Sequence, residues 1–426
     1  MKGRPRAPGR SGNSSRRSYR HLWTATTTSA FGNGVVVSAL PLLAAGMTRR
    51  PLGIAALSAA EGLPWLLLAL PAGVLVDRFD RRRLMQAADG VRALVLVLMV
   101  LGIMRHILSL FTLYAFAVLL GTGQTLSMGA TTAMLPGIVP TEDLPRANGL
   151  LASTQMLGEQ TIGPVLGSLL FGVAAAFPFA VDGISFLGSA LVLSGVPDVR
   201  ASSRQWQAGQ LRHEPVMRSA RAGLAWFLGQ PVLVVLVATI AAMAFSQSMM
   251  LGVLVLFALR CLHIARSGYG LLLAIGALGA AVSGAAAKTV LGRLGTSRTI
   301  LAAGLVAGAA YVTLWATSSA EVAGAALFVE GGAVMAGNVA SNVVRQSLIP
   351  SDMLGRVGNV TRMFIWGAVP LGALAGGAAA TAWGLRAPLL LAGGLQVATV
   401  AVAARPLLRL LPPSPDTPSV APTGEA

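Results

Sequence analysis

Charged residues are scarce in this chain of 426 residues. They make up 11% of it, whereas soluble globular domains contain about 25%. Hydrophobic residues make up 54%, and the mean hydropathy is +0.71. This composition argues against a soluble fold and predicts a membrane protein.

Acidic residues are the scarcer of the two charge classes, with 15 Asp and Glu against 32 Lys and Arg. The formal net charge is therefore +17, a value that can indicate nucleic-acid binding. Such binding requires a basic face on a soluble domain, and here the arginines punctuate apolar runs. No recognition motif accompanies the charge, so we expect no nucleic-acid partner.

Cysteine is almost absent, since Cys261 stands alone and can form neither an internal disulfide nor a cysteine-based zinc cluster. The four histidines are scattered, so we expect no metal site. The chain lacks a phosphate-binding G-x-x-x-x-G-K-[ST] loop, a hydrolase nucleophile elbow and a zinc-protease helix. We therefore expect neither an enzyme nor an ATP-driven pump, and no cofactor.

Long apolar runs are what the chain does contain, each roughly 17 to 27 residues long, as a tilted transmembrane helix requires. A polar stretch divides twelve of them into two sets of six. The sequence thus predicts an all-α polytopic membrane protein with twelve transmembrane helices in two six-helix bundles. The predicted spans are 22–46, 52–76, 87–104, 109–135, 147–173, 178–196, 231–258, 268–291, 299–318, 322–344, 358–382 and 386–406.

The domain organisation follows from these runs. We expect a disordered basic cytoplasmic arm, an N-terminal half, a cytoplasmic linker, a C-terminal half and a disordered cytoplasmic tail. Their respective boundaries are 1–20, 21–196, 197–222, 223–409 and 410–426.

Arginine placement predicts the orientation. An even number of spans puts both termini on one side of the membrane. With that side inside, the inner segments hold about four times as many Lys and Arg residues as the outer turns. This bias predicts a multi-pass protein of the plasma or inner membrane with both termini cytoplasmic.

The two halves also resemble each other in sequence. At an offset of 210 residues, Pro140 matches Pro350, Arg146 matches Arg356 and Gly167 matches Gly377. This pattern predicts a parallel repeat of two six-helix halves. Such halves place a substrate cavity between them near mid-membrane.

A charged loop separates the second and third spans. An aspartate at a cytoplasmic helix end can pair with arginines and with the N-terminus of another helix. Contacts of this kind can form in one conformation and break in another, as a latch does; the alternative is simple topology signalling by arginine. The residues assigned to this latch are Gly73, Asp77, Arg78, Arg81, Arg82, Asp89 and Arg92.

The fifth span carries small residues and a proline, at Gly158, Gly163, Pro164 and Gly167. Small residues allow helices to approach closely, and proline bends a span. Ordinary glycine packing is the alternative interpretation of this pattern.

Four acidic residues, Glu61, Glu159, Asp182 and Glu330, fall inside predicted spans. A carboxylate is costly within a bilayer, so such residues usually face a cavity or a partner. Burial favours the neutral form, which makes these residues candidates for proton coupling. Glu159 and Glu61 lie nearest mid-span and Glu159 is preferred, whereas Asp182 and Glu330 are expected nearer the outer surface. A structural pair or hydrogen bond is the alternative for each.

Uncharged polar and aromatic residues in the spans could line a substrate path, although each alone is more often helix packing. The cavity candidates are Asn33, Gln124, Gln155, Gln160, Gln247, Asn338, Asn342 and Trp366.

Several of these stretches resemble the major facilitator superfamily. The 73–83 loop resembles its G-x-L-x-D-R-x-G-R-R signature, with Asp80 in place of glycine. The fifth span resembles the antiporter signature g-x-x-x-G-P-x-x-G-G of its exporters, with Glu159 and Ser168 departing from the pattern. Three stretches are similar to the branch that holds enterobactin exporters and macrolide efflux proteins, namely 76–92, 147–186 and 345–372.

This resemblance implies the major facilitator fold and a transporter working by alternating access. We expect the protein to be monomeric. The resemblance further implies export of a small amphipathic molecule, such as a siderophore, antibiotic or drug, in exchange for protons. The expected partners are therefore the substrate, protons and the lipid bilayer, with the proton gradient as the energy source. The alternatives are a proton-coupled importer and a membrane sensor or assembly protein that transports nothing.

Overall fold

The computed structural model describes residues 12–196, 216–350 and 353–410, with side chains described at 16–68, 79–196, 221–350, 353 and 357–409. Every regular element in these ranges is a helix. Eleven helices of this described part are long and apolar enough to cross a membrane. The all-α polytopic prediction is confirmed.

The predicted fifth span, 147–173, is the one not among these eleven helices, because it is a run of three shorter helices. These are α5 (Leu144–Gln155), the π-helix η2 (Met156–Ile162) and α6 (Gly163–Val173). The Gly163 N–H donates to the Gly158 carbonyl five residues back, and Pro164 has no N–H with which to resume the α pattern. The widened turn therefore sits directly before the Gly-Pro pair.

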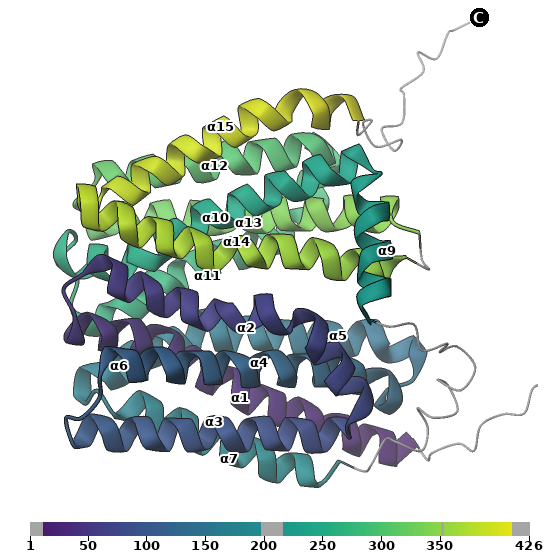
Figure 1. Cartoon of the computed structure of the whole chain (residues 1–426), viewed down its shortest axis with the longest axis vertical. Helices are drawn as coiled ribbons and strands as arrows, with labels where there is room; N and C mark the ends of the chain where they lie inside the picture. Colours follow the sequence, from purple (N-terminus) through teal and green to yellow (C-terminus); the bar gives the residue numbers. More distant parts are fainter. Residues whose placement is uncertain (1–11, 197–215, 351–352, 411–426) are drawn as a thin grey trace, which may run out of the picture.

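The helices form two groups, which Figure 1 shows one above the other. The N-terminal half consists of α1 (Gly12–Met47), α2 (Pro51–Arg78), α3 (Arg81–Met104), α4 (Leu110–Ile138), the α5–η2–α6 run and α7 (Phe177–Ser194). The C-terminal half consists of α10 (Pro231–Arg260), α11 (Tyr269–Leu294), α12 (Thr296–Ala316), α13 (Ala320–Leu348), α14 (Leu354–Trp383) and α15 (Ala387–Leu410). Two short turns, η1 (Thr141–Asp143) and η3 (Arg266–Gly268), precede α5 and α11.

Two segments predicted as irregular are partly helical. Helix α1 begins at Gly12, and the Tyr19 hydroxyl, 3.2 Å from the Ala147 carbonyl, joins its first turns to α5. Helix α9 (Val216–Leu228) occupies the end of the expected linker and lies across one end of the bundle (Figure 1). Buried Phe227 stacks on Phe364 of α14, which gives α9 a reason to fold there. The rest of the arm, the linker and the tail lies outside the described residues.

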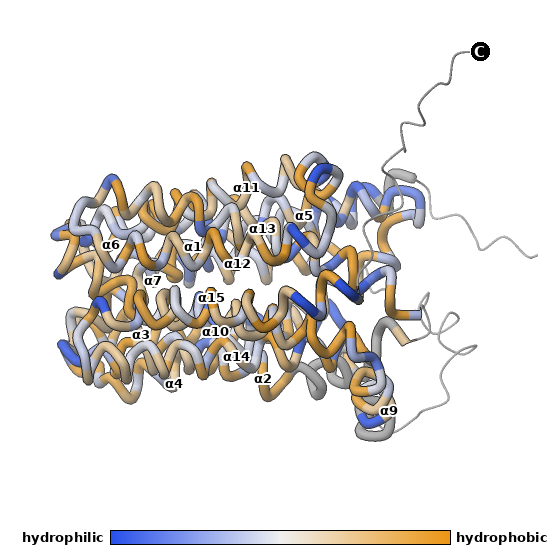
Figure 2. Tube along the Cα trace, turned by 90° about the horizontal axis from the view of Figure 1, so that it is seen from above, coloured by the Kyte–Doolittle hydropathy of each residue, from blue (hydrophilic) through white to orange (hydrophobic). Residues whose placement is uncertain are grey.

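The outer surface of the bundle is apolar along much of its length. Figure 2 shows hydrophilic stretches mainly at the two ends of the helices, with hydrophobic stretches between them. Large side chains such as Ile184, Leu191 and Val402 are among the most exposed of the described hydrophobic residues. An apolar exterior of this extent suits contact with lipid tails rather than with water.

The two ends of the bundle differ in how the halves meet. We call the end where α1 begins and α15 finishes the terminal end (Figure 1). At the opposite end, the closed end, three hydrogen bonds between described residues cross between the halves. They run from the Leu52 N–H to Thr381 Oγ1 (3.3 Å), from Ser168 Oγ to the Ser267 carbonyl (2.8 Å) and from Arg260 Nη1 to the Arg49 carbonyl (3.4 Å).

Candidate functional site

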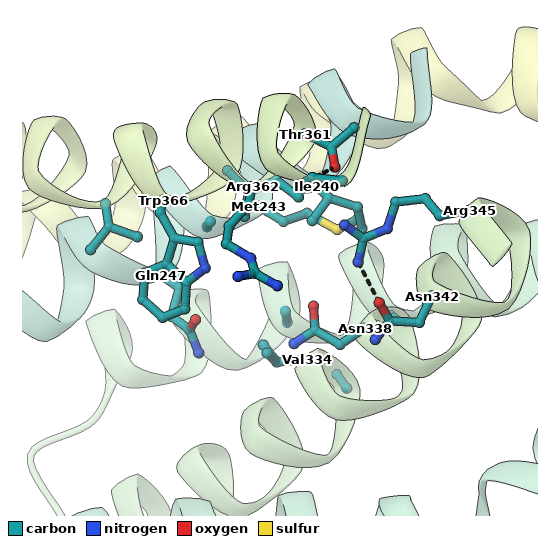
Figure 3. A pocket seen from close by; sticks show the side chains of 18 of the residues that line it. Ile240, Met243, Gln247, Val334, Asn338, Asn342, Arg345, Thr361, Arg362 and Trp366 are labelled. Carbon is teal, nitrogen blue, oxygen red and sulfur yellow. Dashed lines mark hydrogen bonds between the residues drawn. The ribbon is translucent and has the colours of Figure 1, made fainter. Parts of the chain in front are cut away.

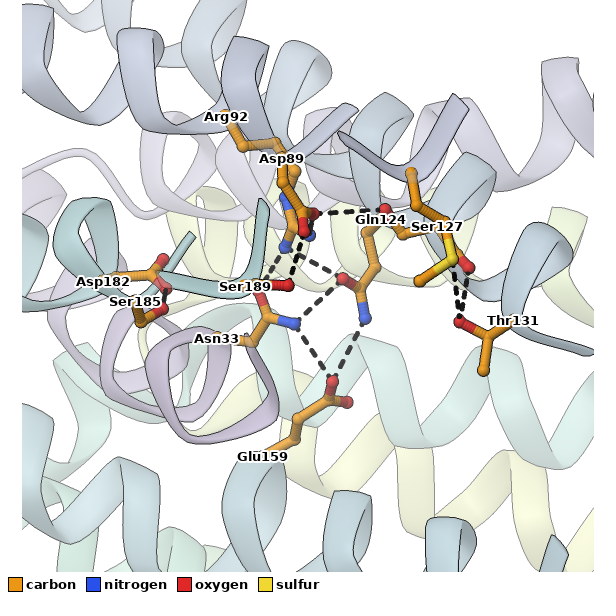
Figure 4. Close-up of polar contacts among 11 residues, drawn as sticks. Asn33, Asp89, Arg92, Gln124, Ser127, Thr131, Glu159, Asp182, Ser185 and Ser189 are labelled. Carbon is orange, nitrogen blue, oxygen red and sulfur yellow. Dashed lines mark hydrogen bonds and ion pairs between the residues drawn. The ribbon is translucent and has the colours of Figure 1, made fainter. Parts of the chain in front are cut away.

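A buried arginine organises the interior of the N-terminal half. Arg92 of α3 donates to Asn33 Oδ1 of α1 and to Gln124 Oε1 of α4, the latter at 2.9 Å (Figure 4). Its guanidinium carbon lies 3.8 Å from the centroid of the Phe186 ring of α7. Arg92 therefore joins four helices of one half, and it is only 3% exposed.

Glu159 lies opposite Arg92, in the π-helix η2. Its Oε1 accepts from Asn33 Nδ2 (3.1 Å) and from Gln124 Nε2 (3.2 Å), so two amides bridge the glutamate to the arginine (Figure 4). Because π-turns often occur at functional sites, the placement of Glu159 in one supports a functional role.

Two further carboxylates complete what we call the Arg92 cluster: Asn33, Asp89, Arg92, Gln124, Glu159 and Asp182. Asp89 lies 3.7 Å from Arg92 and accepts from Ser189 Oγ at 2.7 Å. Asp182 accepts from Ser185 Oγ at 3.0 Å and interacts electrostatically with Arg92.

The charges of the Arg92 cluster do not balance when all its groups are ionised. Three carboxylates face one guanidinium, which would leave two uncompensated negative charges in a protein interior. Uncompensated buried charge is strongly unfavourable. Taking up one or two protons therefore lowers the free energy of the cluster, which is the chemistry a proton-coupled transporter needs.

The structure places Asp89 and Arg92 in the interior of the N-terminal half, whereas the sequence interpretation placed them with the charged loop near the surface. Arg92 lies eleven residues into α3, about 16 Å along the helix from Arg81. Its partners are the interior groups described above. A spacing of three residues showed correctly that the pair meets, but not how deep it lies.

The remaining latch residues lie at the terminal end. Arg81 Nη1 donates to the Ala133 carbonyl of α4 at 2.9 Å, and Arg82 Nη1 donates to the Val196 carbonyl after α7 at 2.6 Å. Asp80 caps α3 by accepting from the Arg83 N–H at 3.1 Å, which accounts for an acid where the signature has glycine. The side chains of the other three, Gly73, Asp77 and Arg78, lie outside the described residues.

The signature residues of the fifth span pack the α5–η2–α6 run closely against other helices. A Cβ at Gly163 would overlap Gly34 of α1, and a Cβ at Gly167 would overlap the Val35 carbonyl. The Pro164 carbonyl accepts from Ser38 Oγ at 2.8 Å and also lies against Gly270 of α11. Gly158 also lies against the α1 backbone. The run therefore contacts α1 in its own half and, through Pro164, α11 in the other half.

The other predicted acids differ in their surroundings. Glu330 of α13 accepts from the Tyr311 hydroxyl and from Gln247 Nε2, each at 3.0 Å. Glu330 and Asp182 are both buried. Glu61 of α2 is half-buried, and its side chain has no hydrogen bond or ion pair within the described part of the chain.

A cavity of about 500 Å³ lies within the C-terminal half, among α10, α12, α13, α14 and α15 (Figure 3). We call it the C-half cavity. Four predicted residues line it: Gln247, Asn338, Asn342 and Trp366.

The other predicted cavity residues lie elsewhere. Asn33, Gln124 and Gln155 line a much smaller space, about 30 Å³, beside the Arg92 cluster. Gln160 is exposed and lines neither space.

The sequence interpretation missed two arginines, Arg345 and Arg362, that line the C-half cavity. It counted both only as positive charges on the inner side of the membrane. Helical spacing could have revealed them. Arg345 follows Asn338 and Asn342 at intervals of seven and three residues, and Arg362 precedes Trp366 by four, so each shares a helix face with cavity candidates.

Comparison with known proteins agrees with this architecture. The model of the transmembrane secretion effector family matches residues 13–419, almost the whole chain. No curated protein matches the chain.

Solved structures share the fold at low identity. A D323A mutant of the nucleoside transporter NupG has a TM-score of 0.75 at 9% identity, covering 92% of this chain and 99% of that one. An inward-facing, unoccupied bacterial homologue of the lysosomal transporter Spinster has a TM-score of 0.70 at 15% identity, with 94% and 99% covered.

A bacterial homologue of the iron transporter ferroportin, in an inward-facing state, has a TM-score of 0.67 at 16% identity, with 92% and 100% covered. These likenesses concern the fold, and the family match extends over nearly the full length. The chain belongs to the transmembrane secretion effector family and is a membrane transporter of the major facilitator type.

Proposed function

We propose that this protein exports a small amphipathic molecule, such as a siderophore, antibiotic or drug, by proton antiport. It works as a monomer by alternating access in the plasma or inner membrane, with both termini cytoplasmic. The name of the family, secretion effector, supports the outward direction. The Arg92 cluster carries the proposal, because it places three carboxylates around one guanidinium inside a membrane-spanning half.

In this proposal the terminal end faces the cytoplasm. The hydrogen bonds across the closed end then seal the outer side. The C-half cavity, which extends toward the terminal end at Arg345 and Ile349, is reached from the cytoplasm or the inner leaflet. The conformation is therefore inward-facing, ready to receive substrate.

Glu159 is the proposed proton carrier because it connects the cluster to the contact between the halves. It lies just before α6, whose Pro164 packs on α11 and whose Ser168 donates to Ser267 across the closed end. Protonating Glu159 removes its charge from the two amides and from Arg92, which weakens its hydrogen bonds. A shift of η2 can then move α6 and alter the Ser168–Ser267 hydrogen bond, which helps to hold the outer side closed.

The proposed cycle follows from this coupling. Substrate binds from the inner side, and the halves rock to open outward. A proton from outside enters the Arg92 cluster, favours substrate release and resets the inward-facing state. Protons move down their gradient while substrate moves out.

The experiment uses everted membrane vesicles acidified inside, in which the cytoplasmic face of the transporter is outside. Siderophores, macrolides and other amphipathic compounds are added one at a time while a dye reports the internal pH. The expected result is compound-dependent loss of the pH gradient together with accumulation of the compound inside. Net movement of a compound toward the cytoplasmic face would contradict export, and transport unaffected by collapsing the gradient would contradict proton coupling.

A further inference from the structure

The C-half cavity carries an excess of positive charge. We propose that it binds an amphipathic anion, so that the exported molecule has a carboxylate, sulfonate or phosphate next to an apolar body. This inference deepens the proposed function and rests on it, since it names the chemical class of the substrate.

Two arginines supply the charge from neighbouring helices. Arg345 belongs to α13 and Arg362 to α14, and Figure 3 shows both guanidinium groups pointing into the cavity. No aspartate or glutamate is among the described residues that line the cavity. Among the described residues, no ion pair involves Arg345 or Arg362, and the Arg92–Asp89 pair lies in the other half.

Much of the donor capacity of these arginines is unused. Arg345 donates to Asn342 Oδ1 through one nitrogen, while its buried Nε has no hydrogen-bond partner. The Arg362 side chain makes no hydrogen bond within the described part of the chain. The nearby buried acid Glu330 is held by Tyr311 and Gln247 and does not line the cavity.

Guanidinium groups in this setting favour a bound anion. Each presents N–H donors in a fixed planar fork that matches a carboxylate or phosphate. Arg345 is partly buried and has no carboxylate partner among the described residues, so it gains more from such a ligand than a fully solvated arginine does. Arg362 is exposed and adds a second positive charge. Asn338, whose side chain points into the same space, can add a neutral hydrogen bond (Figure 3).

The rest of the lining is suited to an apolar body. Met243, Ile365 and Val369 line the cavity together with Trp366, whose ring stacks on Trp65 of the N-terminal half at 5.3 Å between centroids. A volume of about 500 Å³ is within the range of drug-sized ligand pockets. The geometry thus separates an anionic group, near the arginines, from an aromatic or aliphatic body near the tryptophans.

The experiment measures binding to the purified full-length protein in lipid nanodiscs, by calorimetry and without a pH gradient. The probes have one naphthalene body and differ in charge: 1-naphthaleneacetate, 1-naphthyl phosphate, the neutral 1-naphthaleneacetamide and the cationic 2-(1-naphthyl)ethylamine. We expect one or both anions to bind at least about tenfold more tightly than the amide, and the amine to bind most weakly.

Variants locate the preference within the cavity. Arg345→Gln and Arg362→Gln should each reduce the anion-over-amide ratio by about tenfold, and Arg362→Lys should keep part of it because the charge remains. Arg293→Gln is the matched control, since Arg293 is an exposed arginine at the end of α11 that does not line the cavity. It should leave the ratio unchanged.

Three results would overturn the inference. One is equal binding of anion and amide, another is no anion binding at up to about 10 mM, and the third is an equal loss of preference in Arg293→Gln. The proposed function can fail separately. An intact anion preference without proton-coupled transport would remove the antiport mechanism and keep the anion site.

Discussion

The two halves share a helical frame but place their polar groups at different positions. Helix α4 spans 110–138 and α13 spans 320–348, so they correspond at the same offset of 210 residues that the sequence repeat shows. At that offset the cluster members on α4, η2 and α7 correspond to apolar residues of the C-terminal half. The pairs are Gln124 with Val334, Glu159 with Val369, and Asp182 with Ala392.

The exchange also runs in the other direction. Polar residues of the C-half cavity correspond to apolar residues of the N-terminal half: Asn338 with Met128, Arg345 with Leu135, and Arg362 with Ala152. One half therefore has a tightly packed cluster with excess acid, and the other a cavity of about 500 Å³ with excess base. The difference teaches that a repeated fold can divide its chemistry, with protons proposed for one half and an anionic substrate for the other.

Removing the one cation of the N-terminal cluster should have the largest effect. Arg92→Met leaves Asp89, Glu159 and Asp182 without a counter-charge, and breaking a buried pair in this way destabilises a protein by about 3–5 kcal/mol. We expect a sharp loss of folded protein in detergent, measured by thermal unfolding and by size-exclusion yield.

A second change tests the cause of that loss. Asp89→Asn added to Arg92→Met removes one of the stranded charges and should recover part of the stability. The control is Arg83→Met, an exposed arginine in the first turn of α3. Equal stability of the Arg92 and Arg83 variants would show that the cluster needs no cation.

The next largest effect concerns proton coupling. Glu159→Gln keeps an oxygen that accepts from Asn33 and Gln124, but it removes the group that exchanges a proton. We expect substrate-driven proton flux to be lost while the anion probes still bind in the other half. Proton flux in the everted vesicles measures the effect, and Glu142→Gln, an exposed acid of the same half, is the control. Unchanged flux in Glu159→Gln would move the role to another acid.

The comparison between halves shows what the sequence could reveal. Twelve apolar runs and the repeat at 210 residues predicted the fold, because span length and helix pairing follow from hydropathy and spacing. The same patterns placed Glu159, Gln124 and Asn33 inside spans, and the structure brings all three together. Composition and spacing are enough to predict properties of a single helix, such as its length and which residues lie within it.

Two properties could not be derived in this way: how deep a side chain lies in the bundle, and which side chains of different helices point toward the same space. Asp89 and Arg92 were assigned to the surface because the charged loop lies nearby in sequence, whereas α3 carries them into the interior. Arg345 and Arg362 were interpreted through topology alone, although they share a cavity formed by different helices. At the π-turn of 156–162, Gly158 and Gly163 lie against α1, a contact between helices that one sequence does not display.

A smaller effect is expected from the buried acid of the C-terminal half. In Glu330→Gln the amide oxygen can still accept from Tyr311 and Gln247, so the unfolding free energy should change by no more than about 1.5 kcal/mol. Proton flux should retain its dependence on the gradient, because proton coupling is proposed for the other half. The vesicle assay and thermal unfolding measure both properties on one preparation. Loss of coupling in this variant would show that both halves exchange protons and would break the proposed division.

The smallest expected effect lies at the contact that joins the halves. Ser168 stands where the antiporter signature has glycine, and its hydroxyl donates to the Ser267 carbonyl across the closed end at 2.8 Å. Ser168→Ala removes this bond, which is worth about 1 kcal/mol, and should shift the balance toward the outward-open state by about fivefold.

Spin labels measure this shift as a larger population of long distances across the closed end. They are attached at two exposed positions of that end, Arg105→Cys and Trp383→Cys, in a Cys261→Ser background. Ser194→Ala is the control, since that hydroxyl bonds only to the Leu191 carbonyl of its own helix among the described residues. If the distance distributions of the two variants coincide, the Ser168 hydroxyl does not hold the halves together, and closure rests on the packing of α2 against α14.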